Sequence, residues 1–289
     1  MNIVTHNEGF HADDVFATAV MQILYGNEAN IKRSRNQEDI EAADIVYDVG
    51  SIYDESKNRF DHHQKDGAGE RENGIPYAAF GLVWKKWGEE LCGSQEVADI
   101  VDHRLVQVVD AHDNGFVTHD KRDEDYSSYT LDKMVKTFHP SWKEEREYDE
   151  RFFKAVDFVR PLVEREIVLA KHKVEAAPIV EKAYKDAEDK RLIIFDKFVP
   201  RGDVLKKYKE PAFVITPDEN SGTWKMLAVE DDNFVNRIDP PMEWRGLYDE
   251  ELQIVSGVED AVFCHRSGFL IIAKSYEGII KMADIVLKR

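Results

Sequence analysis

The sequence of 289 residues holds few features that would anchor a chain to a membrane or staple it with disulfides. Its two cysteines, Cys92 and Cys264, lie far apart and form no metal-type pair. This excludes a disulfide framework and is typical of a reducing compartment. No apolar run approaches the length of a membrane span, and the N-terminus MNIVTHNEGFHADD lacks the basic and apolar regions of a signal peptide. We therefore expect a cytoplasmic protein with no membrane partner.

Positive charge does not balance negative charge: 39 Lys and Arg stand against 57 Asp and Glu, for a formal net charge of −18. Such a surface repels nucleic acid and anionic membranes at long range. A phosphate-bearing substrate would then need local positive charge, from metal ions or from a few well-placed Arg and Lys. The hydrophobic content of 43% is enough for folded cores, so we expect one large or two ordinary domains.

The first sixty residues alternate strand-like and helix-like segments. Apolar runs predict strands at 2–5, 29–35 and 44–50, and helical spacing predicts helices at 12–26 and 37–43. Residues 53–63 alternate around a turn and predict a hairpin. This order is typical of an α/β fold with a parallel sheet.

From residue 76 onward the pattern turns helical, with helices predicted at 76–93, 94–115 and 143–188. Pro161 and Pro178 predict breaks or restarts in the last of them. Strands follow at 191–196, 212–216, 224–230, 261–264 and 269–274, and then a final helix at 275–287. The predicted layout is an N-terminal parallel-sheet domain (1–142), a helical connector (143–188) and a smaller C-terminal α+β domain (189–289).

Histidines and aspartates gather where four of these elements begin or end. In an α/β sheet, sites form outside the carboxyl ends of the strands. The residues concerned are His6, His11, Asp13 and Asp14 after the first strand, Asp48 after the third, Asp61, His62 and His63 after the hairpin, and Asp110, His112 and Asp113 at a helix end. Four such segments together predict a metal site.

Each of these residues alone has an ordinary explanation, such as a solvated loop or the first turn of a helix, where carboxylates favour the helix dipole. The adjacent pair His62 and His63 is the hardest to explain in that way, because neighbouring side chains of a strand point to opposite faces. Imidazole and carboxylate without thiolate suit Mn²⁺, and less well Mg²⁺, Zn²⁺ or Fe²⁺. The number of candidates favours two divalent ions that share a carboxylate, a pair suited to displacement at phosphorus.

In chain order, the segments HNEGFHADD, YDVG, RFDHHQ and DAHDNG resemble the four motifs of the DHH phosphoesterase superfamily. Within it, the chain is most similar to the melanocyte-proliferating-gene family of metal-dependent hydrolases, which PPMEWRGLYDEEL and FCHRSGFLIIAKSYEGIIKMA near the C-terminus also resemble. The resemblance implies a DHH-type catalytic domain and a two-metal phosphoesterase. It further implies 3′–5′ exonuclease activity, for which short single-stranded RNA or a small phosphodiester is the expected substrate.

The same resemblance implies roles by position. One ion takes His6, His11 and Asp48, and the other takes Asp13, the bridging Asp48, His62 and either Asp110 or Asp113. Asp61 holds the His62 ring, and His63 faces the phosphate, so that Asp48, Asp61 and His63 are the expected catalytic residues. The superfamily's glycine-rich histidine motif is absent from the tail, and CHRSGF is its candidate replacement. The expected phosphate contacts there are His265, Arg266, Arg245 and Lys274.

Three alternatives stay open. Arg245 has an ordinary reading as the ion-pair partner of Asp249 or Glu250. A pyrophosphatase or small-molecule phosphatase on the same scaffold would favour a tail rich in Lys and Arg, which this tail is not. A non-catalytic metal-binding protein would not need every ligand position to be filled, and here every position is filled.

Aromatic residues on the connector, such as Trp142 and Phe158, are more typical of a core or a subunit contact than of a surface that stacks bases. This makes a homodimer a reasonable expectation.

Overall fold

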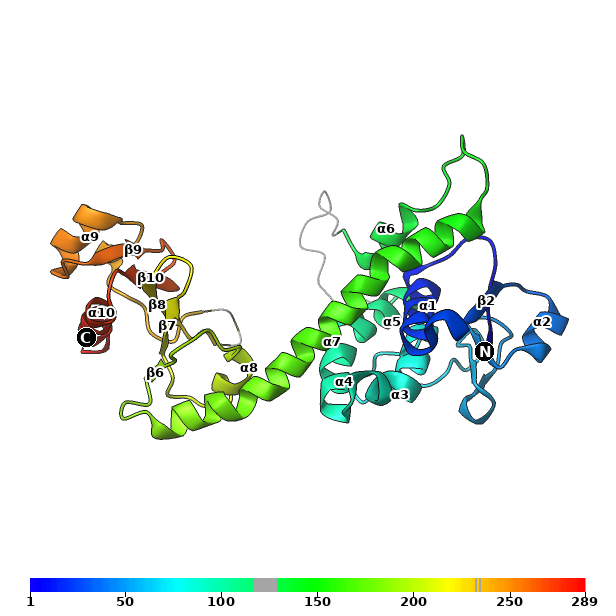
Figure 1. Cartoon of the computed structure of the whole chain (residues 1–289), viewed down its shortest axis with the longest axis horizontal. Coiled ribbons are helices and arrows are strands. Elements are labelled where there is room, and N and C mark those ends of the chain that lie inside the picture. The colour runs from blue at the N-terminus through cyan, green and yellow to red at the C-terminus, as the bar shows by residue number, and fades with distance from the viewer. Residues whose placement is uncertain (117–128, 232, 234, 289) are drawn as a thin grey trace. The chain divides into compact units, whose positions relative to one another are not determined.

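The computed structural model describes residues 1–116, 129–231, 233 and 235–288 of the chain (Figure 1). The chain divides into two compact units, Met1–Lys171 and His172–Arg289. The divide falls within the helix α7 (Tyr148–Asp186), and each unit has its own five-stranded sheet. The predicted division into two domains and a connector stays a prediction.

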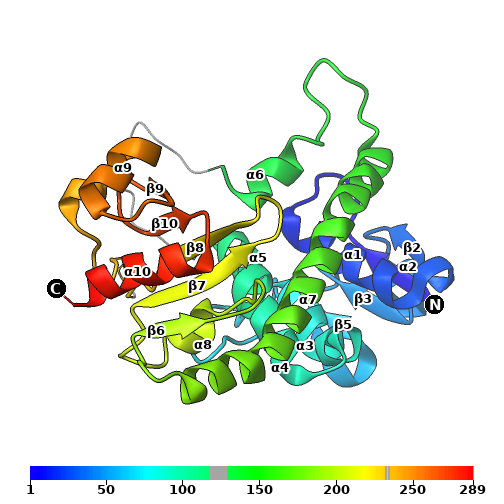
Figure 2. The same ribbon diagram turned by 60° about the vertical axis from the view of Figure 1, so that its left-hand side comes forward.

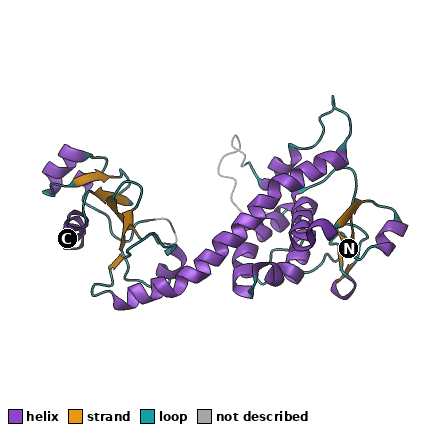
Figure 3. Cartoon of the chain, in the orientation of Figure 1, coloured by secondary structure: helices purple, strands orange, loops and turns teal. Residues whose placement is uncertain are grey.

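The first unit is built on a mostly parallel sheet with the strand order β2-β1-β3-β5-β4. The strands are β1 (Asn2–Thr5), β2 (Asn30–Arg33), β3 (Ile45–Tyr47), β4 (Tyr53–Asp54) and β5 (Arg59–Phe60). β1 pairs in parallel with β2 and β3, and β3 with β5, whereas β4 and β5 form the antiparallel hairpin. The predicted α/β class is confirmed, and Figure 3 shows the strands of each unit flanked by helices.

Helices α1 (Ala12–Tyr25), α2 (Gln37–Ala42), α3 (Ala79–Cys92), α4 (Gln95–Val101), α5 (Gln107–Asp113) and α6 (Leu131–Lys136) complete the first unit, with short 3₁₀ turns η1 (Gly26–Glu28) and η2 (Glu55–Lys57). The first ten residues of α1 are all buried, because this segment has no polar face. The helix predicted at 94–115 is real but irregular. A π-helical turn, η3 (Asp102–Val106), separates α4 from α5.

The predicted breaks at Pro161 and Pro178 are wrong, because α7 continues through both prolines. A proline removes one backbone donor and crowds the preceding turn, but both rings lie on the exposed side of the helix. The opposite side carries buried residues at helical spacing, among them Phe152, Val156 and Val163. The free energy gained by burying this stripe is larger than the cost of the two backbone hydrogen bonds that the prolines remove.

The second unit has the strand order β6-β7-β8-β10-β9, in which only the β6–β7 pair is parallel. Its strands are β6 (Leu192–Ile194), β7 (Phe213–Asp218), β8 (Thr223–Ala228), β9 (Ala261–Cys264) and β10 (Leu270–Ala273). Its helices are α8 (Gly202–Leu205), α9 (Asp249–Ser256) and α10 (Tyr276–Leu287), with a 3₁₀ turn η4 (Met242–Trp244). One core lies under α9 and α10, and a second lies under α8 and the last turns of α7. Across the described ranges, no helix combines the length and apolarity needed to cross a membrane.

Candidate metal centre

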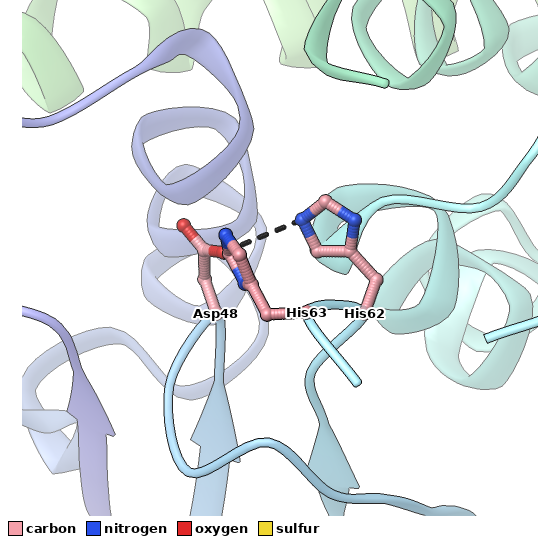
Figure 4. A group of neighbouring side chains, drawn as sticks. All are labelled: Asp48, His62 and His63. Carbon is pink, nitrogen blue, oxygen red and sulfur yellow. Dashed lines mark ion pairs between the residues drawn. The ribbon is translucent and has the colours of Figure 1, made fainter. Parts of the chain in front are cut away.

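Three neighbouring strands deliver the predicted residues to one edge of the first sheet. His6 follows β1, Asp48 follows β3, and the triplet Asp61–His63 follows β5. Because these strands are parallel, their carboxyl ends meet. Figure 4 shows Asp48 beyond the end of one strand and His62 and His63 beyond the end of its neighbour, with their polar groups turned toward one another. The adjacent histidines therefore lie in a loop beyond the sheet, where both rings reach the same side.

The ligand atoms form three overlapping groups of a size suited to a metal ion. They are Asp48 with His62 and His63, His6 with Asp14 and Asp48, and Asp13 with His62 and Asp113, each within 4.8 Å. Asp48 and His62 each belong to two groups. The Asp48 backbone has a φ of 55°, in the left-handed region that non-glycine residues adopt mainly in turns and functional sites.

Imidazoles and carboxylates balance each other within this cluster. His6 Nε2 lies 3.1 Å from Asp14 Oδ2 and 3.2 Å from Asp48 Oδ2. Burial opposes a charge on the ring, but Asp14 and Asp48 outweigh it and raise the pKa of His6 to about 10. Burial of His62 is likewise outweighed by Asp113 and Asp48, which raise its pKa to about 11. Protonated rings thus take the place of cations when no metal is bound, and a metal ion must displace these protons.

The carboxylates show the complementary effects. Burial, with the charges of Asp48 and Asp113, raises the pKa of Asp13 well above its ordinary value. Burial also opposes ionisation of Asp48, but contacts with His6 and His62 prevail and lower its pKa. These opposite directions within a few ångström are typical of functional sites.

Several buried atoms of the cluster lack a hydrogen bond within the described part of the chain. They are Asp14 Oδ2, Asp48 Oδ1 and His62 Nε2. His62 Nε2 lies 3.2 Å from Asp113 Oδ2 without reaching hydrogen-bond geometry. Buried polar atoms without partners are rare because each is costly. A divalent cation would satisfy all three, so the donor set fits a metal.

Backbone groups hold two of these carboxylates in place. Asp13 accepts hydrogen bonds from Ala79 N (3.0 Å) and Phe80 N (2.6 Å) at the start of α3. Asp14 Oδ1 accepts one from His11 N (2.8 Å), which leaves Oδ2 for the cluster. Sequence reasoning did not select Asp14 as a ligand. The sequence did hold a signal that could have predicted this ligand. The segment that forms α1 has no polar face, so both carboxylates of its first turn are buried.

Asp61 supports the neighbouring histidines. Its carboxylate accepts hydrogen bonds from Ser51 N, His62 N and His63 N, and its Oδ1 lies 2.7 Å from His63 Nδ1. Burial opposes ionisation, but His63 and these amides lower the pKa of Asp61, and Asp61 in turn raises the pKa of His63. The ring that Asp61 orients is therefore that of His63, whose side chain is 60% exposed.

The two candidate aspartates of the fourth motif have different surroundings. Asp113 lies in the cluster beside His62. Asp110 is fully buried, 2.7 Å from Arg71 Nη1, and its Oδ1 accepts a hydrogen bond from Gly81 N at 2.9 Å. His11 is exposed, with its ring centroid 6.3 Å from that of His6, and it belongs to none of the three groups. The ligand roles predicted for Asp110 and His11 stay predictions.

The sequence as a whole matches a known family. The model of the MYG1_exonuc family, described as "Uncharacterised protein family (UPF0160)", covers residues 2–287. The chain belongs to the MYG1_exonuc family. The predicted resemblance to this family is confirmed, and the predicted class of enzyme, a hydrolase, agrees with the exonuclease named among its relatives.

Members of this family match over almost the whole chain. "MYG1 protein C27H6.8" of Caenorhabditis elegans is 31% identical over 324 residues, covering 99% of this chain and 95% of the relative. "MYG1 exonuclease" of Bos taurus is 30% identical over 329 residues, covering 99% and 84%. Among solved structures, "pGpG-specific phosphodiesterase - PggH from Vibrio cholrae" is 13% identical with a TM-score of 0.32, covering 99% of this chain and 97% of that one. Family membership rests on the sequence matches.

The tail of this family member holds the predicted phosphate contacts within the second unit. Arg245 Nη2 lies 3.0 Å from Asp239 Oδ2 and donates to Pro240 O. The ion pair expected with Asp249 or Glu250 is therefore made with a different carboxylate. His265 Nδ1 lies 2.8 Å from Ser267 Oγ, and the side chains of Arg266 and Lys274 are exposed. Their contact with substrate stays a prediction.

Proposed function

We propose that the chain is a metal-dependent phosphodiesterase that removes nucleotides from the 3′ end of short single-stranded RNA and works with two divalent ions, Mn²⁺ first among them. One observation carries the proposal. His6, Asp14 and Asp48 form one group of ligand atoms, and Asp13, His62 and Asp113 form another. Both groups contain buried atoms that lack hydrogen bonds, and Asp48 Oδ1 of the first lies 3.6 Å from His62 Nε2 of the second. The name "MYG1 exonuclease" of the relative from Bos taurus supports the removal of terminal nucleotides.

These two groups suggest how the ligands divide between the two ions. His6, Asp14 and Asp48 would hold one ion. Asp13, His62 and Asp113 would hold the other, with the second oxygen of Asp48 reaching toward it. Mixed nitrogen and oxygen donors without sulfur suit Mn²⁺ and then Mg²⁺. Asp14 takes the place that the sequence predicted for His11, and Asp113 is the aspartate that we propose from the fourth motif.

The remaining residues position the substrate. When bound, divalent ions supply charge that polarises the phosphodiester and lowers the pKa of an attacking water. His63 is exposed beside the cluster, and Asp61 keeps its ring oriented and favours its protonated form. A protonated His63 donates a hydrogen bond to a non-bridging phosphate oxygen, where negative charge develops. The net charge of −18 disfavours long nucleic acid, which supports a short substrate.

The test uses metal-stripped protein that is reloaded with Mn²⁺ and given 5′-labelled RNA of a few to about twenty nucleotides. The wild type should produce a ladder that shortens from the 3′ end. Asp48→Ala should abolish both this ladder and Mn²⁺ retention, whereas Asp54→Ala, at the end of β4 and outside the cluster, should behave as the wild type.

Other outcomes would redirect the proposal. Intact RNA with released phosphate from pyrophosphate or a small phosphoester would show a phosphatase on this scaffold. Retained Mn²⁺ without turnover on any phosphoester would show a metal-binding protein without catalysis. Full activity of Asp48→Ala would refute the metal-centre assignment itself.

A further inference from the structure

The second unit contains a cavity of about 430 Å³, whereas the cluster around Asp48 belongs to the first unit. Its walls come from Lys173 on α7, the segment 198–206 with α8, the start of β7, and the end of β8 with the residues that follow it. Figure 2 shows α8 beside the C-terminal part of α7 and next to the sheet. The apolar part includes Val214, Leu227 and Val229. Small-molecule sites are about this size and combine an apolar lining with a few polar groups.

Arg201 is the unusual residue of this cavity. It is half-buried, and within the described residues its guanidinium donates a single hydrogen bond, from Nη1 to Val199 O at 3.2 Å. It makes no ion pair with any residue that the structure describes. Other partly buried arginines have more partners: Arg33 and Arg71 pair with Asp149 and Asp110, both at 2.7 Å, and Arg59 and Arg237 each donate to several backbone carbonyls. In a chain of net charge −18, a half-buried guanidinium without a carboxylate indicates a site for an external anion.

Phe198 gives the same cavity a flat aromatic surface. Its side chain is 72% exposed, among the highest values for the large hydrophobic residues of the chain. The Arg201 guanidinium lies 5.8 Å from the centre of its ring. An exposed ring beside a cation suits the stacking of a nucleobase, whose phosphate the cation then reaches.

The other charged residues of the lining narrow the ligand further. Lys173 and Asp203 form an ion pair at 2.6 Å, so they add little net charge. Glu230 supplies an acceptor, which suits a ligand that also carries hydroxyl or amino donors. We propose that this cavity binds a nucleoside monophosphate, with its phosphate on Arg201 and its base on Phe198. The proposal stands whether or not the metal centre cleaves RNA.

Equilibrium dialysis of adenosine 5′-monophosphate against the full chain tests this site. EDTA is present throughout, so that no metal can bind phosphate at the cluster. One nucleotide should bind per chain, and Arg201→Gln should weaken binding about tenfold or more, since it removes a charge-assisted contact. Phe198→Leu keeps an apolar side chain without the ring and should weaken binding severalfold. Arg191→Gln is the matched control, because Arg191 pairs with Asp189 outside the cavity, and it should bind as the wild type.

A second measurement needs no variant and guards against misfolding of the substituted proteins. Bound nucleotide should slow acetylation of Lys206, which lines the cavity, but not of Lys281 on α10. Lack of saturable binding, unchanged binding by Arg201→Gln, or equal protection of both lysines would overturn the site. Inorganic phosphate that binds as tightly as the nucleotide would overturn the nucleotide assignment and leave a simple anion site.

Discussion

Two aspartates three residues apart on one helix show two ways of burying a carboxylate. Asp110 faces a guanidinium and a backbone amide, and both of its oxygens have partners. Asp113 faces the His62 ring and the Asp13 carboxylate, in a cluster where buried atoms lack hydrogen bonds. The first arrangement is complete within the chain, whereas the second needs an added cation. A metal site is thus recognised by the acceptors left without partners and not by the number of acidic residues.

The sharpest way to break this comparison is to remove each carboxylate in turn. Asp113→Ala should lower the Mn²⁺-dependent hydrolysis of phosphodiesters at least about a thousandfold, because a ligand is lost. It should change the stability of the metal-free fold little, because repulsion from Asp13 and attraction to His62 are lost together. Asp110→Ala should instead lower the melting temperature while the remaining folded protein retains Mn²⁺. Steady-state rates, Mn²⁺ titration and thermal unfolding measure the three quantities, and the reverse pattern would show that Asp110 is the ligand.

The partner of Asp110 should matter for stability and only indirectly for chemistry. Arg71 also contacts Asp102, and its side chain is 7% exposed. Arg71→Met should lower the free energy of unfolding by about 3 kcal/mol, because it leaves a buried carboxylate unpaired. The matched variant Arg104→Met breaks an exposed pair with Glu166 and should cost about 1 kcal/mol or less. Urea denaturation in EDTA compares the two variants. Equal losses of unfolding free energy would show that the Arg71–Asp110 pair contributes no more than an exposed ion pair.

The close approach of α3 to Asp110 depends on a glycine. A Cβ at Gly81 would lie 1.8 Å from Asp110 Oδ2, whereas a Cβ at Gly202 would meet nothing within 4 Å. Gly81→Ala should therefore destabilise the fold by about 1–3 kcal/mol through overpacking, despite the better helix propensity of alanine. Gly202→Ala should be neutral or stabilising. Thermal unfolding of both variants gives the answer, and a stabilising Gly81→Ala would mean that α3 and α5 can separate freely.

A further effect concerns pH. Burial outweighs Arg71 and raises the pKa of Asp110 from 3.8 to about 7. The folded state thus holds this proton more tightly than the unfolded chain does. The resulting stabilisation is complete below about pH 4 and is lost as the pH rises through about 7. Asp110→Asn does not titrate, so the stability of the metal-free wild type relative to this variant should fall between about pH 4 and pH 7. A constant difference across that range would show that Asp110 keeps an ordinary pKa.

The local sequence pattern and one topological rule were enough to predict that much of the site lies at one edge of the sheet. His6, Asp48 and the Asp61–His63 triplet follow strands that the sequence indicates, and parallel pairing puts their ends at one edge. The ion pair of Asp110 was out of reach, because Arg71 lies in a loop without periodicity whose fold depends on tertiary contacts. The same holds for α7. The local chemistry of proline predicts a break in the helix, but packing of its buried side keeps the helix continuous.

The π-helical turn η3 sets the register of everything that follows it on α5. Such a turn accommodates one more residue than regular α-helical winding does. Deletion of a single residue within Asp102–Val106 would restore an ordinary helix and leave the downstream side chains facing as they do now, whereas insertion of one residue would rotate them by about 100°. An insertion would thus turn Asp113 away from His62 and Asp110 away from Arg71. Sequences related to this chain should therefore lose one residue in this segment far more readily than they gain one.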